Sequence, residues 1–166
     1  MKHIYRPSHA DYTTDQKYGI RATSGGGSAS ARETIGRVAA ASVAEQVLAQ
    51  VLPELRVVAF VESIYHVKAK QIDVSSLSKE VVDQFELRCP DKKAHEAMKA
   101  LVMRVKSSGD SVGGVIRCVI KQMPVALGCP VFDKLQADFA KALMSIPASR
   151  GFEIGSGFSA CDLLGS

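Results

Sequence analysis

The sequence predicts an α+β fold, and three observations support this prediction. The longest segment with helical spacing of apolar residues runs from Ser30 to Leu52, directly after a glycine-rich turn. Two segments rich in Val, Ile and Phe, Leu55–Tyr65 and Val112–Val125, are typical of strands. Two further amphipathic segments, Asp91–Lys106 and Pro130–Met144, indicate helices. A length of 166 residues suits one domain or a substantial piece of a larger one.

The N-terminal segment Met1–Thr23 has little periodicity and many polar residues, so we expect a loop or a set of short turns. Its densest cluster of reactive groups is Arg6-Pro7-Ser8-His9-Ala10-Asp11. His9 lies between Arg6 and Asp11, which can hold the imidazole in place and shift its pKa. Taken alone, His9 is more simply a surface histidine than an acid-base group.

The turn Gly25-Gly26-Gly27 precedes the long helix and indicates an anion site. Consecutive glycines allow positive φ, and the N–H groups at a helix start attract phosphate. Ser28 or Ser30 can cap the helix, and with Ser30 as N-cap, Glu33 completes a capping box. Arg32 in the first turn opposes the helix dipole unless an anion lies beside it. A flexible loop followed by an ordinary cap is the alternative.

The helix predicted over Ser30–Leu52 is followed by Pro53, which cannot continue it. Its middle contains Gly36 and the small residues Ala39–Ser42, so we expect other elements to cover it on more than one side. The strand predicted over Leu55–Tyr65 is expected to be mostly buried.

The middle of the chain predicts a turn at Asp73–Ser76 and a short helix over Ser78–Phe85. The helix Asp91–Lys106 is expected to expose His95 to solvent. Its predicted inward face consists of Ala94, Met98, Leu101, Val102 and Val105.

Gly109-Asp110-Ser111 is expected to be a turn, with a ligand-binding role as the alternative. Gly113-Gly114 indicates a bulge or a close backbone contact near the start of the strand that follows. Gly151–Phe158 is expected to be a glycine-containing strand. The helix Pro130–Met144, closed by Pro147, is expected to direct inward Phe132, Leu135, Phe139 and Leu143.

Composition excludes several classes of protein. Apolar residues make up 46% and charged residues 23%, which is ordinary globular composition. No window approaches the length of a membrane span, and Met1–Pro7 is too polar for a signal peptide, so we expect a soluble, unexported chain. Four separated cysteines and four histidines form no metal-binding spacing, so we expect reduced thiols and no zinc. A net charge of +4, spread along the chain, suits a small anionic ligand as well as nucleic acid.

Several segments, in order, resemble the chorismate synthase family, and together they span nearly the whole chain. They are Arg6–Tyr12, Lys17–Gly19, Gly25–Thr34, Arg37–Ala40, Gly109–Gly114, Pro130–Leu135 and Ala142–Phe158.

The resemblance implies a β-α-β sandwich in which a helical core lies between two antiparallel sheets, assembled as a homotetramer. Residues 1–166 would be the central portion of one such domain. The implied reaction is the 1,4-elimination of phosphate from 5-enolpyruvylshikimate 3-phosphate to give chorismate, in the shikimate pathway of aromatic amino acid biosynthesis. It implies a lyase that needs reduced FMN, with NADPH only if the parent protein also reduces its flavin. A cytoplasmic location is implied, or a plastid if a transit peptide precedes the chain, with no nucleic-acid or membrane partner.

The resemblance also assigns site residues. His9 would be a catalytic acid next to the flavin, and Arg6 and Arg32 would belong to the basic pocket for the anionic substrate. Ser30 and Ala148 would contact the flavin, and no metal is implied.

The sequence departs from the family pattern in the glycine-rich segment. Ser28 and Ala29 stand where the family has Arg and Ser, which removes a charge and a hydroxyl from the expected cofactor site. Smaller departures are Thr14, Ala41 and Cys129.

The family's Gly-Glu-Ser-His and Arg-His-Asp-Pro segments, which carry its other catalytic groups, are not found in the sequence. We therefore expect the isolated chain to be inactive, with exposed apolar surface and unpaired sheet edges. The alternative is a non-catalytic truncated homologue that keeps an anion-binding or oligomerisation surface. A basic nucleic-acid module is a weaker third interpretation, because no recognised motif accompanies the charge.

Overall fold

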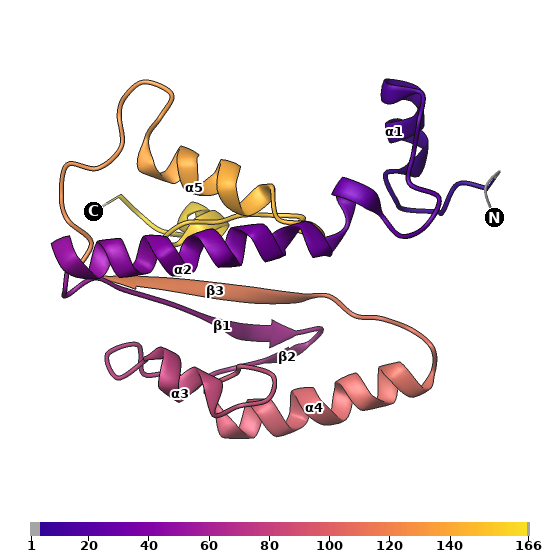
Figure 1. Cartoon of the computed structure of the whole chain (residues 1–166). Coiled ribbons are helices and arrows are strands. Elements are labelled where there is room, and N and C mark those ends of the chain that lie inside the picture. Colours follow the sequence, from indigo (N-terminus) through magenta and orange to yellow (C-terminus); the bar gives the residue numbers. More distant parts are fainter. Residues whose placement is uncertain (1–3, 166) are drawn as a thin grey trace. The chain divides into compact units, whose positions relative to one another are not determined.

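The computed structural model describes residues 4–165 and divides into two compact units. One unit comprises Met1–Val47 and Pro124–Ser166, and the other comprises Leu48–Met123. Figure 1 labels the helices and strands of both. The predicted α+β class is confirmed, with one three-stranded antiparallel sheet and helices before and after its strands.

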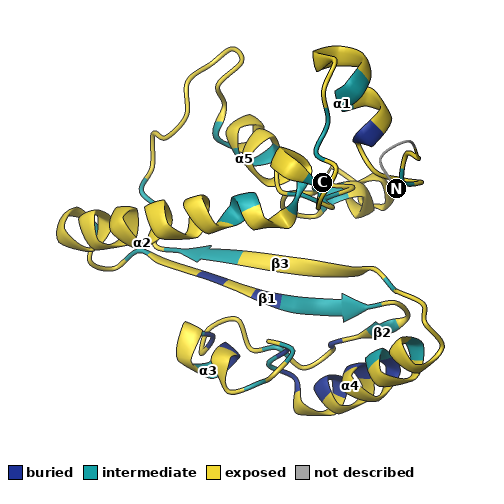
Figure 2. Ribbon diagram, turned by 45° about the vertical axis from the view of Figure 1, so that its right-hand side comes forward, coloured by how far each residue is buried: buried dark blue, intermediate teal, exposed yellow. Residues whose placement is uncertain are grey.

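The sheet belongs to the unit Leu48–Met123, and its strand order is β2-β1-β3. Its strands are β1 (Arg56–Ile64), β2 (Val67–Lys68) and β3 (Gly114–Lys121). Both neighbours of β1 are antiparallel to it, so the two main predicted strands are confirmed. The prediction that the first strand is mostly buried was wrong: in β1 only Val58 and Phe60, two residues apart, are buried (Figure 2). Side chains alternate between the faces of a strand, and one face of β1 packs against the core.

The predicted close backbone contact lies at Gly114, the first residue of β3. A Cβ placed on Gly114 would lie 2.5 Å from the carbonyl oxygen of Ser63. The ladder between β1 and β3 shifts register between Val61 and Ser63, opposite Val115 and Ile116, and Gly114 itself pairs with Ile64. Glycine is therefore required there by the approach of the neighbouring strand.

Two helices of this unit begin where the sequence predicts. Helix α3 (Lys79–Asp83) is capped by Ser78, whose Oγ accepts a hydrogen bond from the N–H of Val81. Helix α4 (Lys92–Ser107) is capped by Asp91, whose Oδ1 accepts from the N–H of Ala94. The predicted turn after Asp73 is also present, because its Oδ1 accepts from the N–H and hydroxyl of Ser75.

The core of this unit has two clusters of buried apolar side chains. Three of the residues predicted for the inward face of α4, Ala94, Met98 and Leu101, are buried. The first cluster contains Val58, Phe60, Leu77 and Val82, and the second Ala69, Cys89, Ala94 and Met98.

The prediction that His95 is solvated was wrong, because its side chain is only 6% exposed. Its ring lies edge to face with Phe85, with 5.3 Å between the ring centroids. His95 directly follows Ala94 of the buried face, and the segment after α3 places Phe85 against the imidazole ring. Nδ1 of His95 is buried and has no hydrogen-bond partner among residues 4–165.

In the other unit, Asp11–Tyr18 forms helix α1, so the prediction of a loop over Met1–Thr23 was wrong for these residues. The helix buries no apolar residue among its eight, and such a helix has no periodic signal. Its ends stabilise it: Asp11 carries a negative charge in the first turn, and Gly19 ends it with φ 67° and an N–H bond to Asp15. Met1–His3 lie outside the described residues.

The long predicted helix is present as α2 (Thr34–Val51), preceded by two 3₁₀ turns, η1 (Gly27–Ala29) and η2 (Ala31–Glu33). None of the residues in α2 is buried, so the prediction of burial on several sides was wrong. Small residues permit close approach, but they do not supply the covering element. The apolar side chains left exposed include Ile35, Val38, Val43, Val47 and Val51.

Helix α5 (Leu135–Met144) begins five residues later than predicted. The preceding segment instead forms an isolated bridge between Cys129 and Asp133. Phe132, predicted to point inward, is 86% exposed, whereas Leu135 and Phe139 are half-buried. The inward prediction was also wrong for Leu143, which is exposed.

The strand predicted over Gly151–Phe158 is not formed. A 3₁₀ helix, η3 (Gly157–Asp162), follows an irregular segment instead. Gly155 and Gly157 have φ of 61° and 55°, which interrupts extended backbone.

Candidate anion-binding and acid-base site

His9 lies at the end of a tight turn, Arg6-Pro7-Ser8-His9. The N–H of His9 donates to the carbonyl of Arg6 at 3.3 Å, and Ser8 has φ 59°. Proline at the second position and positive φ at the third are features of a type II turn. A residue other than glycine pays about 1 kcal/mol for this conformation. The turn therefore presents His9 at some cost in backbone energy.

The imidazole of His9 is held by its own turn. Nδ1 lies 2.8 Å from the carbonyl oxygen of Pro7, and the residue is exposed. A carbonyl oxygen only accepts, so Nδ1 is the donor in this contact. Nε2 is consequently the ring atom free to exchange a proton with a ligand.

Arg6 and Asp11 form a two-pronged ion pair in front of helix α1. Arg6 Nε donates to Asp11 Oδ2 at 2.9 Å, and Arg6 Nη2 to Oδ1 at 2.7 Å. Nη2 also donates to the carbonyl of Gly25 at 3.1 Å. The structure thus joins the His9 turn to the glycine-rich turn, which lies far from it in the sequence.

Asp11 is 6% exposed and has a second cationic partner, Arg21, whose Nη1 lies 3.4 Å from Oδ2. The hydrogen bond from Arg6 is the main cause that holds the pKa of Asp11 well below its usual range, against the opposing effect of burial. Two guanidinium groups, those of Arg6 and Arg21, therefore share the Asp11 carboxylate.

The structure corrects the expected partners of His9 and adds one residue, Arg21, to this cluster. Arg6 and Asp11 bind each other rather than the imidazole of His9, which Pro7 holds instead. Arg21 was missed, because a single arginine outside any motif gives no signal. Its guanidinium donates to the carbonyl of Ile4 and lies 5.1 Å from the centre of the Tyr5 ring.

The positive φ predicted for the glycine-rich turn is present at Gly25 and Gly27, with values of 71° and 56°. Beyond this turn, Ser30 is an N-cap, as predicted, and its Oγ accepts from the N–H of Arg32 at 3.3 Å. The predicted capping box is not formed, because the first turn is 3₁₀ and the carboxylate of Glu33 pairs with Arg37.

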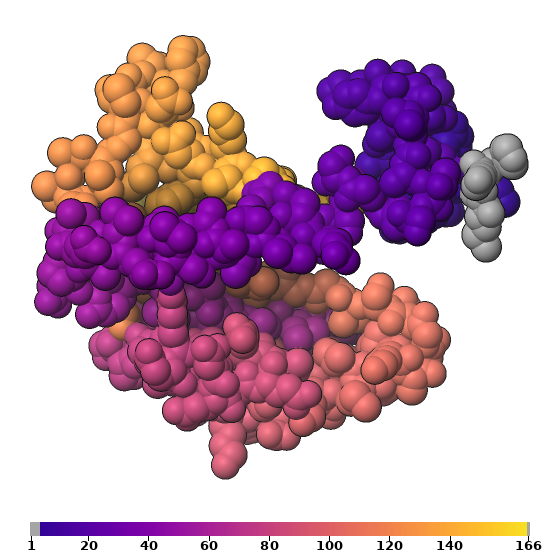
Figure 3. Space-filling view, viewed as in Figure 1, coloured from indigo at the N-terminus to yellow at the C-terminus, as the bar shows by residue number. Residues whose placement is uncertain are grey.

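Arg32 is exposed at this helix start, and its guanidinium has no hydrogen bond or ion pair within the described range 4–165. Figure 3 shows the N-terminal segment as a cluster of atoms next to the beginning of α2. A cation without a counter-charge in the first turn is suited to an anionic ligand.

Ala148 follows α5 and has φ 69°, again in the left-handed region. Its segment is tied to α2: Arg37 Nη1 donates to Ser145 Oγ at 2.6 Å, and Nη2 donates to the carbonyl of Ser145. The predicted site residues His9, Ser30, Arg32 and Ala148 lie on separate segments. Among the residues that the structure describes, no side-chain hydrogen bond or ion pair joins one of these segments to another through these four residues.

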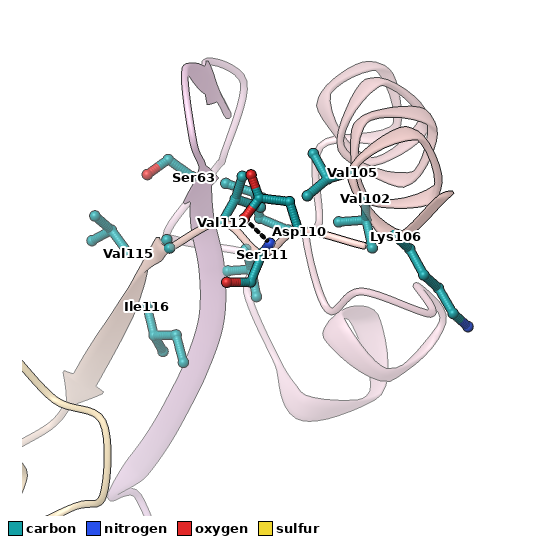
Figure 4. Close-up of a pocket in the computed structure, with 13 residues that line it drawn as sticks. Ser63, Val102, Val105, Lys106, Asp110, Ser111, Val112, Val115 and Ile116 are labelled. Atoms are coloured by element: carbon teal, nitrogen blue, oxygen red, sulfur yellow. Dashed lines mark hydrogen bonds between the residues drawn. The ribbon is translucent and has the colours of Figure 1, made fainter. Parts of the chain in front are cut away.

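A cavity of about 510 Å³ lies in the unit Leu48–Met123 between α4 and the sheet. Figure 4 shows Asp110, Ser111 and Val112 in the connection from α4 to β3, with Val102 and Val105 on the helix. The predicted turn is confirmed at Gly109, which has φ 71°, and the N–H of Asp110 donates back to the carbonyl of Val105 at 3.1 Å. A ligand role for this turn stays a prediction.

The four cysteines are free thiols. Within residues 4–165, no three His, Cys, Asp or Glu residues are grouped as metal ligands. None of the helices described has the length and apolar character needed to cross a membrane.

Comparison with known proteins assigns the family. The chorismate synthase family model matches residues 1–166. Curated chorismate synthases of Akkermansia muciniphila and a Synechococcus species are 53% and 54% identical over 165 and 162 residues. These matches cover 99% and 98% of this chain but only 45% and 44% of the relatives, so the chain spans less than half of their length. A crystal structure of chorismate synthase matches with a TM-score of 0.72 and 33% identity, over 82% of this chain and 44% of that one. Because the family model matches along the whole sequence, the chain belongs to the chorismate synthase family.

Proposed function

We propose that this chain is part of a lyase that converts 5-enolpyruvylshikimate 3-phosphate to chorismate, with loss of phosphate and a ring proton. The observation that supports this most is the family match over residues 1–166, which includes the His9 turn and the Arg32 helix start. By this proposal the isolated chain does not complete the reaction, because elimination needs further acid-base groups.

His9 is the proposed acid. With Nδ1 donating to Pro7, a protonated ring presents one N–H, at Nε2, toward a ligand. This arrangement fixes both the atom that holds the proton and the direction in which it leaves.

Arg6 and Arg32 are the proposed substrate-binding cations. Among residues 4–165, the Arg32 guanidinium has no counter-charge and Arg6 Nη1 has no hydrogen-bond partner, while Arg6 Nε and Nη2 hold Asp11. A substrate with phosphate and carboxylate groups could accept hydrogen bonds from these guanidinium N–H groups.

The proposed cofactor is reduced FMN, which the reaction would need although the elimination involves no net redox change. Ser30 and Ala148 would hold it, with the N–H groups at the start of α2 suited to its phosphate or ring oxygens. The bond from Arg37 to Ser145 supports this grouping, because it ties the segment before Ala148 to α2. NADPH enters only if the whole protein reduces its own flavin, and a homotetramer is the proposed assembly.

The test is a chimera in which residues 1–166 replace the matching segment of the Akkermansia muciniphila relative. We expect the chimera to bind reduced FMN and to form chorismate anaerobically. His9→Gln should lower kcat by about 100-fold or more and leave FMN binding in place. His66→Gln changes an exposed histidine of the other unit and is the matched control.

The same experiment tests the alternative, a non-catalytic homologue. A folded chimera that binds no FMN would favour it, with Ser28 and Ala29 as the cause. Recovery of FMN binding in the Ser28→Arg, Ala29→Ser double variant would identify these two positions.

A further inference from the structure

Asp11 is the point at which the His9 turn, helix α1 and Arg21 meet. Its carboxylate accepts from the N–H of Arg6 at 3.2 Å, from Arg6 Nε and Nη2, and from Arg21 Nη1. A carboxylate has about four acceptor positions, so these donors leave no capacity for a substrate. The contacts of Asp11 therefore serve the protein rather than a ligand.

The His9 turn needs an anchor outside itself. Its closing bond, from the N–H of His9 to the carbonyl of Arg6, is long at 3.3 Å, and Ser8 has unfavourable positive φ. Asp11 holds the first residue of this turn through both its backbone and its side chain. Since Asp11 also starts α1 two residues after His9, it restrains the turn from both ends.

We infer that Asp11 is a positioning residue that sets the tautomer and the direction of the His9 imidazole by fixing Arg6. With Arg6 fixed, the carbonyl of Pro7 stays beneath Nδ1, and the proton of neutral His9 resides on that atom. Nε2 then faces the ligand. The catalytic consequence of this role rests on the proposed function, whereas the tautomer itself does not.

The first experiment measures the tautomer of His9 by long-range ¹H–¹⁵N NMR of the full chain with labelled histidine. His9→Gln assigns the signal. Above pH 8 we expect the Nδ1–H form in the native chain, and a mixture of both tautomers in Asp11→Asn. Asp83→Asn is the control, because it removes the carboxylate of a similar but exposed Arg–Asp pair.

Two further variants keep the inference testable if Asp11→Asn fails to fold. Arg6→Lys retains the charge but loses the two-pronged contact with Asp11, so we expect a mixture of both His9 tautomers in this variant as well. Asp11→Glu keeps a carboxylate, so its share of the Nδ1–H form should lie between those of Asp11→Asn and the native chain. An unchanged His9 tautomer in folded Asp11→Asn or Arg6→Lys would overturn the inference.

Activity is the second readout, in the chimera. Asp11→Asn should lower kcat roughly tenfold, which is part of the contribution of a general acid, while Asp83→Asn leaves it unchanged. An inactive native chimera would count against the proposed function alone, since the NMR result stands without it. If Asp11→Asn gives a mixture of His9 tautomers but leaves kcat unchanged, the proposed effect of Asp11 on catalysis would be overturned.

Discussion

At the scale of single residues, the hydrogen bonds of buried polar side chains determine how a substitution changes stability. Asp91 accepts three backbone hydrogen bonds, from Ala94 at Oδ1 and from Lys70 and Gln71 at Oδ2. It therefore caps α4 and also fixes the segment after β2. The bond from Lys70 is the main cause that lowers the pKa of Asp91, and burial opposes it.

Asp91→Asn should destabilise the chain by about 1–2 kcal/mol at pH 7, because an amide nitrogen would face the N–H groups of Lys70 and Gln71. A lowered pKa stabilises the folded state above the unfolded value near 4, and this gain is lost as the pH falls through the folded value. The native chain and the variant should thus converge in stability below about pH 4. Urea unfolding at several pH values measures this, with Asp83→Asn as control. A constant difference down to pH 2 would contradict the assignment.

His95 differs from Asp91, because its buried Nδ1 atom has no hydrogen-bond partner among residues 4–165. His95→Leu removes the polar nitrogen, keeps an apolar contact to Phe85, and should be neutral or stabilising by about 1 kcal/mol. Urea unfolding at pH 7 checks this, and His66→Leu, at an exposed histidine, should change little. A loss of stability in His95→Leu would contradict this expectation.

At the scale of elements, the pairing of β1 with β3 depends on one glycine. Gly114 admits the carbonyl of Ser63, whereas a Cβ at Gly113 would meet no atom within 4 Å. Neither glycine has positive φ, so the two differ in available space and not in backbone conformation.

Gly114→Ala should therefore destabilise the chain by about 1–3 kcal/mol, because the strand must move to admit the methyl group. Gly113→Ala is the matched control and should be within about 0.5 kcal/mol of the native chain. Thermal or urea unfolding compares the two. Equal effects would show that chain entropy, and not the contact with Ser63, decides the role of Gly114.

At the scale of the whole molecule, the two units differ in what holds them together. All the buried apolar side chains among residues 4–165 lie in the unit Leu48–Met123. The other unit has polar anchors instead, such as Asp11 with its two arginines and Arg37 with Ser145. The exposed apolar surface expected from the sequence is present on α2 and on β3, where Ile116 is 72% exposed.

Amide hydrogen exchange should therefore be slow in β1, β3 and α4 and fast in α1 and α2, because the ladder between β1 and β3 and the buried side chains of β1 and α4 protect the first group. Mass spectrometry of the exchanging full chain measures it by peptide. In the chimera, α2 should become protected as further elements cover its apolar residues. Protection of α2 equal to that of β1 in the chain alone would contradict this expectation.

Local patterns in the sequence were sufficient for most elements. The starts of α3 and α4, the two main strands, the close contact near Gly114 and the Gly25–Gly27 turn all follow from spacing and backbone chemistry. The family and its motif residues could also be identified from the sequence, because they are ordered strings of residues.

Only the tertiary structure decided which side chains meet. No local pattern indicates that Asp11 binds Arg6 and Arg21, or that Pro7 holds His9, because these contacts depend on how the turns fold back. The burial of His95 and the exposure of α2 have the same origin, since periodicity shows an apolar face but not what covers it. Helix α1 was hidden for the converse reason, because it has no such face.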